Sequence, residues 1–343
     1  MNGVIALLGS GERSPGMKRV HRALLERRPA GRAVVVDTPY AFQVNREQMT
    51  ERLRTFFRTG FARELEAVRF ARGDVDSPDA VAALRRSLAR ADYVFAGPGS
   101  PTYARELWTS AGIADDLAGV LERGGALCLA SAATLTVGRY TAPIYEVYKA
   151  GAEPHWLDGL DLLSRYGLRC AVIPHFDNAE GEGYDTRYCY LGAPRLALLE
   201  EALPEDVAVL GIDEHTALVL DLEASTLEVV GRSGVEWRTP EGVRRLESGT
   251  RLRLDELANA PLTPRAPAPP TDDPPAPTAD EADAGTSAPE DDALIAAVVL
   301  ARHGERERGD FARADALRDL LARSGVVLHD APDGTTWSRI PAP

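Results

Sequence analysis

Apolar residues in the first 258 positions fall into short runs separated by longer, mixed stretches. The short runs are rich in valine and leucine, which is typical of buried strands, and the mixed stretches repeat apolar positions at helical spacing. We predict strands over 4–8, 33–37, 66–70, 93–96, 126–130, 170–174 and 207–212, and helices over 17–26, 46–57, 78–90 and 193–202. Strands that alternate with helices indicate an α/β, doubly wound, mostly parallel sheet with helices on both faces.

The pattern changes after residue 212 to strand, turn and strand, which predicts an antiparallel edge over 217–222, 227–230 and 235–238. Residues 1–258 therefore form the predicted body. Residues 259–293 are rich in proline, alanine and aspartate, a composition that predicts an extended linker. In the tail, 294–343, the pattern predicts a helical hairpin over 294–324 and then a small β-hairpin that turns at Asp333-Gly334.

The composition narrows the classes of function. The chain has 343 residues, 44% of them apolar, and a net charge of −13. It has no block of basic residues of the kind that captures nucleic acid, and no apolar run long enough to span a bilayer. Its three cysteines lack metal-ligand spacing, so we expect neither a metal site nor a cofactor. We expect a cytoplasmic protein.

Residues with chemical potential follow five of the predicted strands. In a parallel sheet, ligands collect beyond the carboxyl ends of the strands, so these residues should lie together. They are Gly9-Ser10-Gly11-Glu12, Gly97-Pro98-Gly99-Ser100, Ser131, His175-Phe176-Asp177 and Asp213-Glu214-His215. The set contains a candidate nucleophile, a base, an acid and two glycine-rich turns.

Ser131 ends an apolar strand and is flanked by small residues, which is typical of a nucleophile carried on a sharp strand-to-helix turn. A serine in this place also commonly caps the helix after it, so the pattern leaves both roles open. As nucleophile, Ser131 would need His175 to take its proton and Glu214 to orient that imidazole. Backbone N–H groups of Ala132 and Gly99 would then form the oxyanion hole.

These residues carry a resemblance to the serine peptidase family of cyanophycinase and dipeptidase E. The matching motifs are the two glycine-rich turns, the spacing of Gly124-Gly125 from Ser131, the His175-Phe176 pair and the octet 211–218. The resemblance covers residues 1–258 and implies a class I glutamine amidotransferase-like three-layer sandwich. It also implies the triad Ser131, His175 and Glu214, and a homodimer.

Several residues near the expected triad are open to more than one interpretation. Gly11, Ser100, Asp177 and Arg187 are candidate contacts for substrate, and the acidic residues around Arg187 would suit a cationic group or form only a solvated loop. Leu129 and Ala133 stand where the family has glycine, which questions efficient acyl-enzyme chemistry. Cys128 is the alternative nucleophile, because the strand around it also has small-x-Cys-x-small form; otherwise it is a buried apolar residue.

The tail shows a second resemblance. Gly309-Asp310-Phe311 and the residues after them, through Gly325 to Trp337, are similar to the extreme carboxyl-terminal module of cysteinyl-tRNA synthetases over 294–339. That module contacts tRNA in the synthetase. The H-I-G-H and K-M-S-K-S motifs are missing from this sequence, so we do not expect aminoacylation. Because the charge of 294–343 is balanced, we expect a docking module rather than a strong tRNA binder.

The sequence therefore predicts a serine hydrolase of the peptidase or amidase type, with a small peptide or amide as substrate. The alternative is an amidotransferase-like binding protein with weak or no catalysis, which recognises tRNA or another partner through its tail.

Overall fold

The computed structural model describes residues 3–181, 184–259 and 261–264, and in the tail 298–299, 302, 317–318, 321, 326–331 and 334–339. The chain divides into two compact units, Met1–Thr271 and Asp272–Pro343. Among the described residues no helix is long and apolar enough to cross a membrane.

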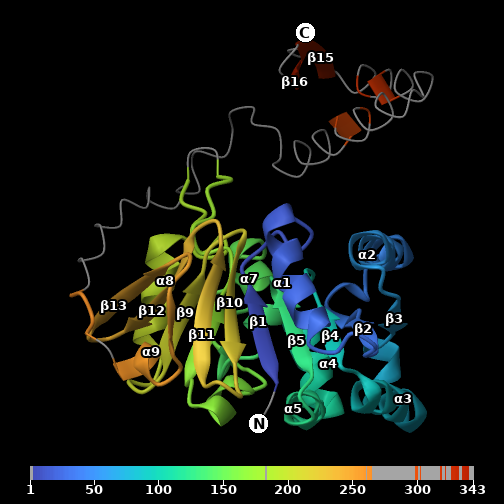
Figure 1. Ribbon diagram of the computed structural model, residues 1–343. Helices are drawn as coiled ribbons and strands as arrows, with labels where there is room; N and C mark the ends of the chain where they lie inside the picture. Colours follow the sequence, from blue (N-terminus) through green and yellow to red (C-terminus); the bar gives the residue numbers. More distant parts are fainter. Residues whose placement is uncertain are drawn as a thin grey trace. The chain divides into compact units, whose positions relative to one another are not determined.

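The first unit is built on an eight-stranded sheet of order β14-β11-β10-β1-β5-β4-β2-β3 (Figure 1). Five of its strands are parallel: β1 (Val4–Leu8), β2 (Ala33–Val36), β3 (Leu65–Val68), β4 (Tyr93–Ala96) and β5 (Ala126–Ala130). Three antiparallel strands extend it beyond β1: β10 (Thr216–Asp221), β11 (Thr226–Gly231) and β14 (Arg251–Arg253). The predicted α/β class with an antiparallel edge is confirmed.

A second sheet has the order β13-β12-β9-β8. Its strands are β8 (Cys170–Ile173), β9 (Ala208–Ile212), β12 (Gly234–Thr239) and β13 (Gly242–Glu247), and only β8 and β9 are parallel. The sequence places β8 and β9 in the main sheet, and the structure differs there. The reason is pairing: β10 occupies the free edge of β1, and β9 pairs with β12 instead.

Helices cover both faces of the main sheet, and α7 and α8 pack against β8 and β9 of the second sheet. The helices are α1 (Pro15–Glu26), α2 (Arg46–Phe61), α3 (Pro78–Arg90), α4 (Pro101–Ala111), α5 (Ala114–Glu122), α6 (Ala132–Leu135), α7 (Ile144–Tyr148), α8 (Gly192–Glu201) and α9 (Glu256–Asn259). Short 3-10 turns lie at Thr38–Tyr40 (η1), Arg72–Asp74 (η2) and Leu163–Tyr166 (η3), and β6 (Tyr140–Thr141) pairs with β7 (Leu157–Asp158).

Alternation along the strands sends apolar side chains to two separate cores. In β5, Leu127 and Leu129 pack in one core with Trp108 of α4, whereas Cys128 packs in the other with Met17 of α1. Burial of both faces explains why these strands are continuous apolar runs. The result is a three-layer arrangement of helices, sheet and helices, as predicted.

Three of the helices begin at a serine followed by proline. Ser14, Ser77 and Ser100 each accept a hydrogen bond from a backbone N–H in the first turn of α1, α3 and α4. Proline suits the next position because its fixed φ is already helical. The predicted helix over 46–57 continues to Phe61, and α2 ends where Ala62 adopts a left-handed conformation, with φ of 51°.

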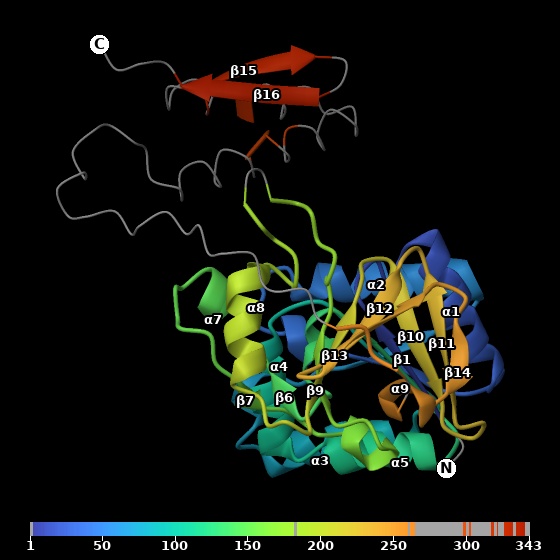
Figure 2. The ribbon, with the colours of Figure 1, turned by 90° about the vertical axis from the view of Figure 1, so that its left-hand side faces the viewer.

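In the second unit, β15 (Val326–Ala331) and β16 (Gly334–Arg339) form the predicted hairpin, drawn as an antiparallel pair in Figure 2. Leu321 and Val326 are buried there against Val298 and Trp337. The predicted helices of the tail lie largely outside the described residues, as does the predicted linker over 259–293 apart from 259 and 261–264.

Candidate active site

Ser131 stands at the turn between β5 and α6, with φ of 52° and ψ of −116°. This conformation is strained for a residue other than glycine, and such strain commonly occurs at functional sites. The backbone N–H of Ser131 donates to the carbonyl of Leu8 at the end of β1, 3.1 Å away. Its side chain makes no capping hydrogen bond to α6. The hydroxyl is therefore free of the capping role that the sequence left open.

The residues that stand in place of glycine fit this turn. Leu129 is buried in one core of the main sheet, pointing to the face opposite Cys128, and Ala133 is fully buried at the start of α6. The Thr134 hydroxyl lies 2.8 Å from the Leu129 carbonyl and 3.2 Å from the Leu8 carbonyl, so it fastens α6 to the ends of two strands. Leucine at 129 therefore does not close the turn.

A chain of two hydrogen bonds connects Ser131, His175 and Glu214. The Ser131 Oγ lies 2.9 Å from His175 Nε2, and His175 Nδ1 lies 2.9 Å from Glu214 Oε1. A carboxylate can only accept, so Nδ1 carries a proton and neutral His175 accepts the serine hydroxyl at Nε2. Hydrogen bonding from His175 lowers the pKa of Glu214 and keeps it ionised. The arrangement can transfer a proton from Ser131 to His175.

The three side chains come from the ends of three different strands. Ser131 follows β5, His175 follows β8 and Glu214 lies between β9 and β10. The two sheets meet here because residues 213–215 connect β9 of the second sheet to β10 of the main sheet. The Phe176 N–H donates to the Ile212 carbonyl, 3.1 Å away, which extends the β8–β9 pair, and the Gly9 N–H donates to the Thr216 carbonyl, 2.9 Å away, which extends the β1–β10 pair. A Cβ on Gly9 would lie 2.0 Å from the Asp213 carbonyl oxygen, so only glycine allows this approach.

Of the two predicted oxyanion residues, Ala132 follows Ser131 directly, and Gly99 lies in the turn after β4, the strand that pairs with β5. Ala132 is the first residue of α6, so its N–H has no acceptor within that helix. Gly99 has φ of 151°, and a Cβ there would lie 1.8 Å from the Pro39 carbonyl oxygen. The neighbouring Ser100 N–H donates to that same carbonyl at 2.8 Å. The turn is therefore fastened to η1, and glycine is the residue that fits it.

Four predicted substrate contacts have partners within the protein. Ser100 caps α4, and Gly11 lies against the His215 ring, which a Cβ would strike at 2.1 Å. Asp177 Oδ1 accepts the N–H of Glu214 at 2.7 Å. Arg187 donates twice to Asp185, at 2.8 and 2.7 Å, and these bonds lower the pKa of Asp185 to about 2. Asp177 and Asp185, two of the acidic residues around Arg187, thus have partners within the protein.

Cys128, the alternative nucleophile, lies inside β5 and is fully buried. Its Sγ is 3.7 Å from His21 Nδ1, and burial raises the pKa of the thiol to about 12. The thiolate is the reactive form of cysteine, so this thiol is a poor nucleophile near neutral pH.

Two further residues near the triad were not predicted from the sequence to have a role in the site. Asn178 is buried and donates from Nδ2 to Glu214 Oε1 at 3.2 Å, and Ser10 Oγ accepts the His215 N–H at 3.1 Å. Ser10 lies in one of the two predicted glycine-rich turns. Asn178 offers only its place three residues after the predicted base, which is a weak signal on its own.

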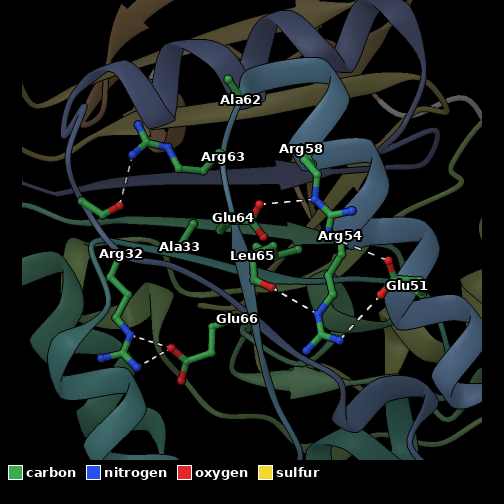
Figure 3. A pocket seen from close by; sticks show the side chains of 11 residues that line it. Arg32, Ala33, Glu51, Arg54, Arg58, Ala62, Arg63, Glu64, Leu65 and Glu66 are labelled. Atoms are coloured by element: carbon green, nitrogen blue, oxygen red, sulfur yellow. Dashed lines mark hydrogen bonds and ion pairs between the residues drawn. The ribbon is translucent and has the colours of Figure 1, made fainter.

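A pocket of about 630 Å³ lies at the opposite edge of the main sheet, beside Ala33 and Leu65, the first residues of β2 and β3. Its guanidinium groups face carboxylates or carbonyls, as Arg58 faces Glu64 and Arg54 faces the Leu65 carbonyl (Figure 3). Among the described residues, no serine, cysteine or histidine lines it. The arginines of this pocket form ion pairs or hydrogen bonds within the protein, and no residue of the triad lines the pocket.

Comparisons with known proteins give one kind of match to most of the chain and another kind to a short stretch. No family model matches it. The solved structure of a peptidase from an acI-B1 actinobacterium superposes with a TM-score of 0.57 and 21% identity, and the match covers 74% of this chain and 97% of that one. A putative peptidase E protein from Listeria monocytogenes EGD-e superposes with a TM-score of 0.41 and 11% identity, over 72% and 99% of the two chains.

A different stretch matches cysteine–tRNA ligases. Identity is 47% over 55 residues with the ligase of Alkalilimnicola ehrlichii, covering 16% of this chain and 12% of that one. It is 53% over 49 residues with the ligase of Acidiphilium cryptum, covering 14% and 11%. This chain thus spans only about a ninth of the length of that second relative. Both predicted resemblances are confirmed: the chain joins a body with the α/β fold of a solved peptidase to a tail similar to the end of cysteine–tRNA ligases.

Proposed function

We propose that this protein is a serine hydrolase that cleaves a peptide or amide bond through an acyl-enzyme on Ser131. The observation that carries the proposal is the continuous chain from Ser131 Oγ through His175 to Glu214, with 2.9 Å at each hydrogen bond. Its geometry is that of a nucleophile, a base and an orienting acid. The strained turn at Ser131, which leaves the hydroxyl uncapped, supports the same role.

The reaction would run in two halves. Ser131 Oγ attacks the carbonyl carbon while its proton moves to His175 Nε2, and the Glu214 carboxylate stabilises the resulting imidazolium. The N–H groups of Ala132 and Gly99 would donate to the oxyanion. The imidazolium then protonates the leaving amine, and the C–N bond breaks. Water, deprotonated by His175, then attacks the ester carbonyl, and the imidazolium returns the proton to Ser131 Oγ as the carboxylic acid leaves.

The test is turnover of a library of small peptides and amides by the purified full chain. We expect hydrolysis of at least one class, with a burst of amine product before steady state if the acyl-enzyme accumulates. Ser131→Ala should abolish both. Cys128→Ala is the matched control, since it removes a thiol from the same strand, and it should retain activity. Hydrolysis that survives S131A, or is lost only in C128A, would refute the proposal.

For the tail we propose partner recognition by a docking module, with weak binding of tRNA as the candidate to test. The similarity to cysteine–tRNA ligases over about 50 residues supports this. The test is binding of the full chain to tRNA as salt is raised. We expect salt-sensitive binding that disappears when 294–343 is removed. Absence of tRNA binding at low salt would favour a protein as the partner of the tail. If the hydrolysis test above finds no activity, partner recognition would be the main function of the chain.

A further inference from the structure

Glu214 is held at two points by two consecutive residues of the loop after β8. Asp177 Oδ1 accepts its backbone N–H at 2.7 Å. Asn178 Nδ2 donates to its carboxylate, at the same Oε1 that accepts from His175 Nδ1. The base and both anchors of the acid therefore lie within four consecutive residues, 175–178. A displacement of this loop would move His175 and Glu214 together.

The side chain of Asn178 is itself fixed. It is 1% exposed, and its Oδ1 accepts the Glu180 N–H at 3.2 Å. Because an N–H faces the oxygen, the amide nitrogen is the atom left to face Glu214, which settles the orientation of the amide. The backbone N–H of Asn178 donates to the His175 carbonyl at 3.2 Å. Both the donor and the residue that carries it are thus held in place.

The loop itself is held by two residues further along the chain. The Tyr188 N–H donates to the Phe176 carbonyl at 2.9 Å, and the Cys189 N–H donates to the His175 carbonyl at 3.0 Å. His175 has φ of 50°, and Tyr188 and Cys189 are also left-handed, at 61° and 57°. These bonds hold the His175 backbone in a conformation that costs free energy. The loop is therefore built to fix its geometry.

A glutamate needs such support more than an aspartate does. Its longer side chain has an additional rotatable bond, and the Glu214 side chain is a quarter exposed, so water competes for its oxygens. A carboxylate that rotates toward water leaves the imidazole without orientation. The Nδ2 donor of Asn178 opposes that rotation.

We propose that Asn178 is a positioning residue for the hydrolysis, holding the Glu214 carboxylate on His175 Nδ1 while Asp177 holds the Glu214 main chain. This inference rests on the proposed function, because it assigns a role within the same reaction. Asn178 does not touch the reacting atoms and acts only through Glu214.

The experiment measures inactivation of the full chain by a fluorophosphonate, which reports the reactivity of the serine without a known substrate. Saturation kinetics separate the maximal inactivation rate from the affinity for the probe. Asn178→Leu keeps the approximate shape of the side chain and removes the donor. Thr186→Val is the matched control: the buried Thr186 hydroxyl donates to the Asn178 carbonyl at 3.3 Å, and its hydrogen bonds are to residues 178 and 181 rather than to Glu214.

We expect N178L to lower the maximal inactivation rate by roughly 10- to 100-fold, the value of a hydrogen bond to a charged group. Affinity for the probe should change by less than about twofold, and T186V should react at close to the wild-type rate. An unchanged rate in N178L, or an equal fall in T186V, would overturn the inference and leave the proposed function standing. Failure of the wild type to react would overturn the proposed function itself.

If N178L does not fold, variants of Asp177 test the same hold on Glu214, because Asp177 holds its main chain. Asp177→Asn keeps an oxygen acceptor for the Glu214 N–H, and Asp177→Ala removes it. We expect D177N to react within about threefold of wild type and D177A to react at least about tenfold more slowly. Equal rates in the two variants would contradict the role of Asp177 in holding Glu214.

Discussion

At the scale of single residues, Ser131 and Cys128 lie three positions apart in one strand-to-helix segment and have opposite environments. Cys128 is enclosed in a core, and its pKa is raised to about 12. Ser131 lies beyond the strand, within 2.9 Å of an imidazole. The sequence favours Ser131 by spacing, but it could not exclude Cys128, because the burial of a residue at a strand end depends on where the turn begins.

The first prediction concerns the charge on Glu214. Glu214→Gln keeps the size of the side chain but removes the charge that stabilises the imidazolium, and its amide favours the wrong tautomer of His175. We expect hydrolysis, measured as kcat, to fall by roughly 100- to 10,000-fold. Glu180→Gln is the control, at one of the acidic residues before Arg187, and it should leave kcat nearly unchanged. A loss of less than about tenfold in E214Q would show that Glu214 is not the third member of the triad.

The second prediction concerns His21, which is fully buried among Phe56, Phe57 and Phe95, with its Nδ1 2.6 Å from the Tyr93 hydroxyl. Burial lowers its pKa from 6.5 to about 4. Between these values the unfolded chain binds a proton that the folded chain does not. The free energy of unfolding should therefore fall as pH drops through this window, by up to about 1.4 kcal/mol per pH unit from this residue.

Urea unfolding at pH 7 and pH 4.5 measures this effect. His21→Gln removes the titration but keeps a polar side chain, so it should be less stable than wild type at pH 7 and lose less stability on acidification. If both proteins lose the same free energy between the two pH values, His21 does not contribute to acid sensitivity.

At the scale of elements, the site depends on the residues just beyond the strand ends rather than on the strands themselves. The sequence could predict which residues stand at the strand ends, because the apolar runs stop there and, after β1 and β4, a glycine follows. It could not predict that β8 and β9 lie in a second sheet, since their apolar pattern is the same in either sheet. Nor could it predict the contacts of Asn178, which depend on the left-handed turn at His175.

The third prediction tests the turn that approaches Ser131 from β4. Gly99→Ala places a Cβ 1.8 Å from the Pro39 carbonyl oxygen at a positive φ, so the turn must move. We expect hydrolysis to fall by at least about tenfold, because the loss of one oxyanion donor alone costs more than that. Gly60→Ala is the control: it lies in α2, its Cβ would meet no atom within 4 Å, and it should be neutral or slightly stabilising. Normal activity in G99A would remove Gly99 from the oxyanion hole.

At the scale of the whole molecule, the chain consists of two units with separate apolar cores. The three clusters of the first unit are built from residues 4–262, and the cluster of the second unit lies around Leu321 and Val326. The triad, the candidate oxyanion residues and the supporting residues Asp177 and Asn178 all belong to the first unit. Hydrolysis should therefore be a property of the first unit alone.

The fourth prediction concerns this division. Removal of 272–343 should leave a folded body, with a thermal midpoint within a few degrees of that of the full chain and an unchanged rate of hydrolysis. Circular dichroism and turnover measure the two quantities. A body that aggregates or loses activity would mean that the tail completes the fold or the site.

The central claim is that Ser131 is a nucleophile. Peptide mapping by mass spectrometry after treatment of the full chain with a fluorophosphonate tests it most directly. The account predicts one adduct, on the peptide that contains Ser131 and localised to that residue, which is absent from the Ser131→Ala variant. An adduct on Cys128 or any other residue, or no adduct on protein shown to be folded, would contradict it.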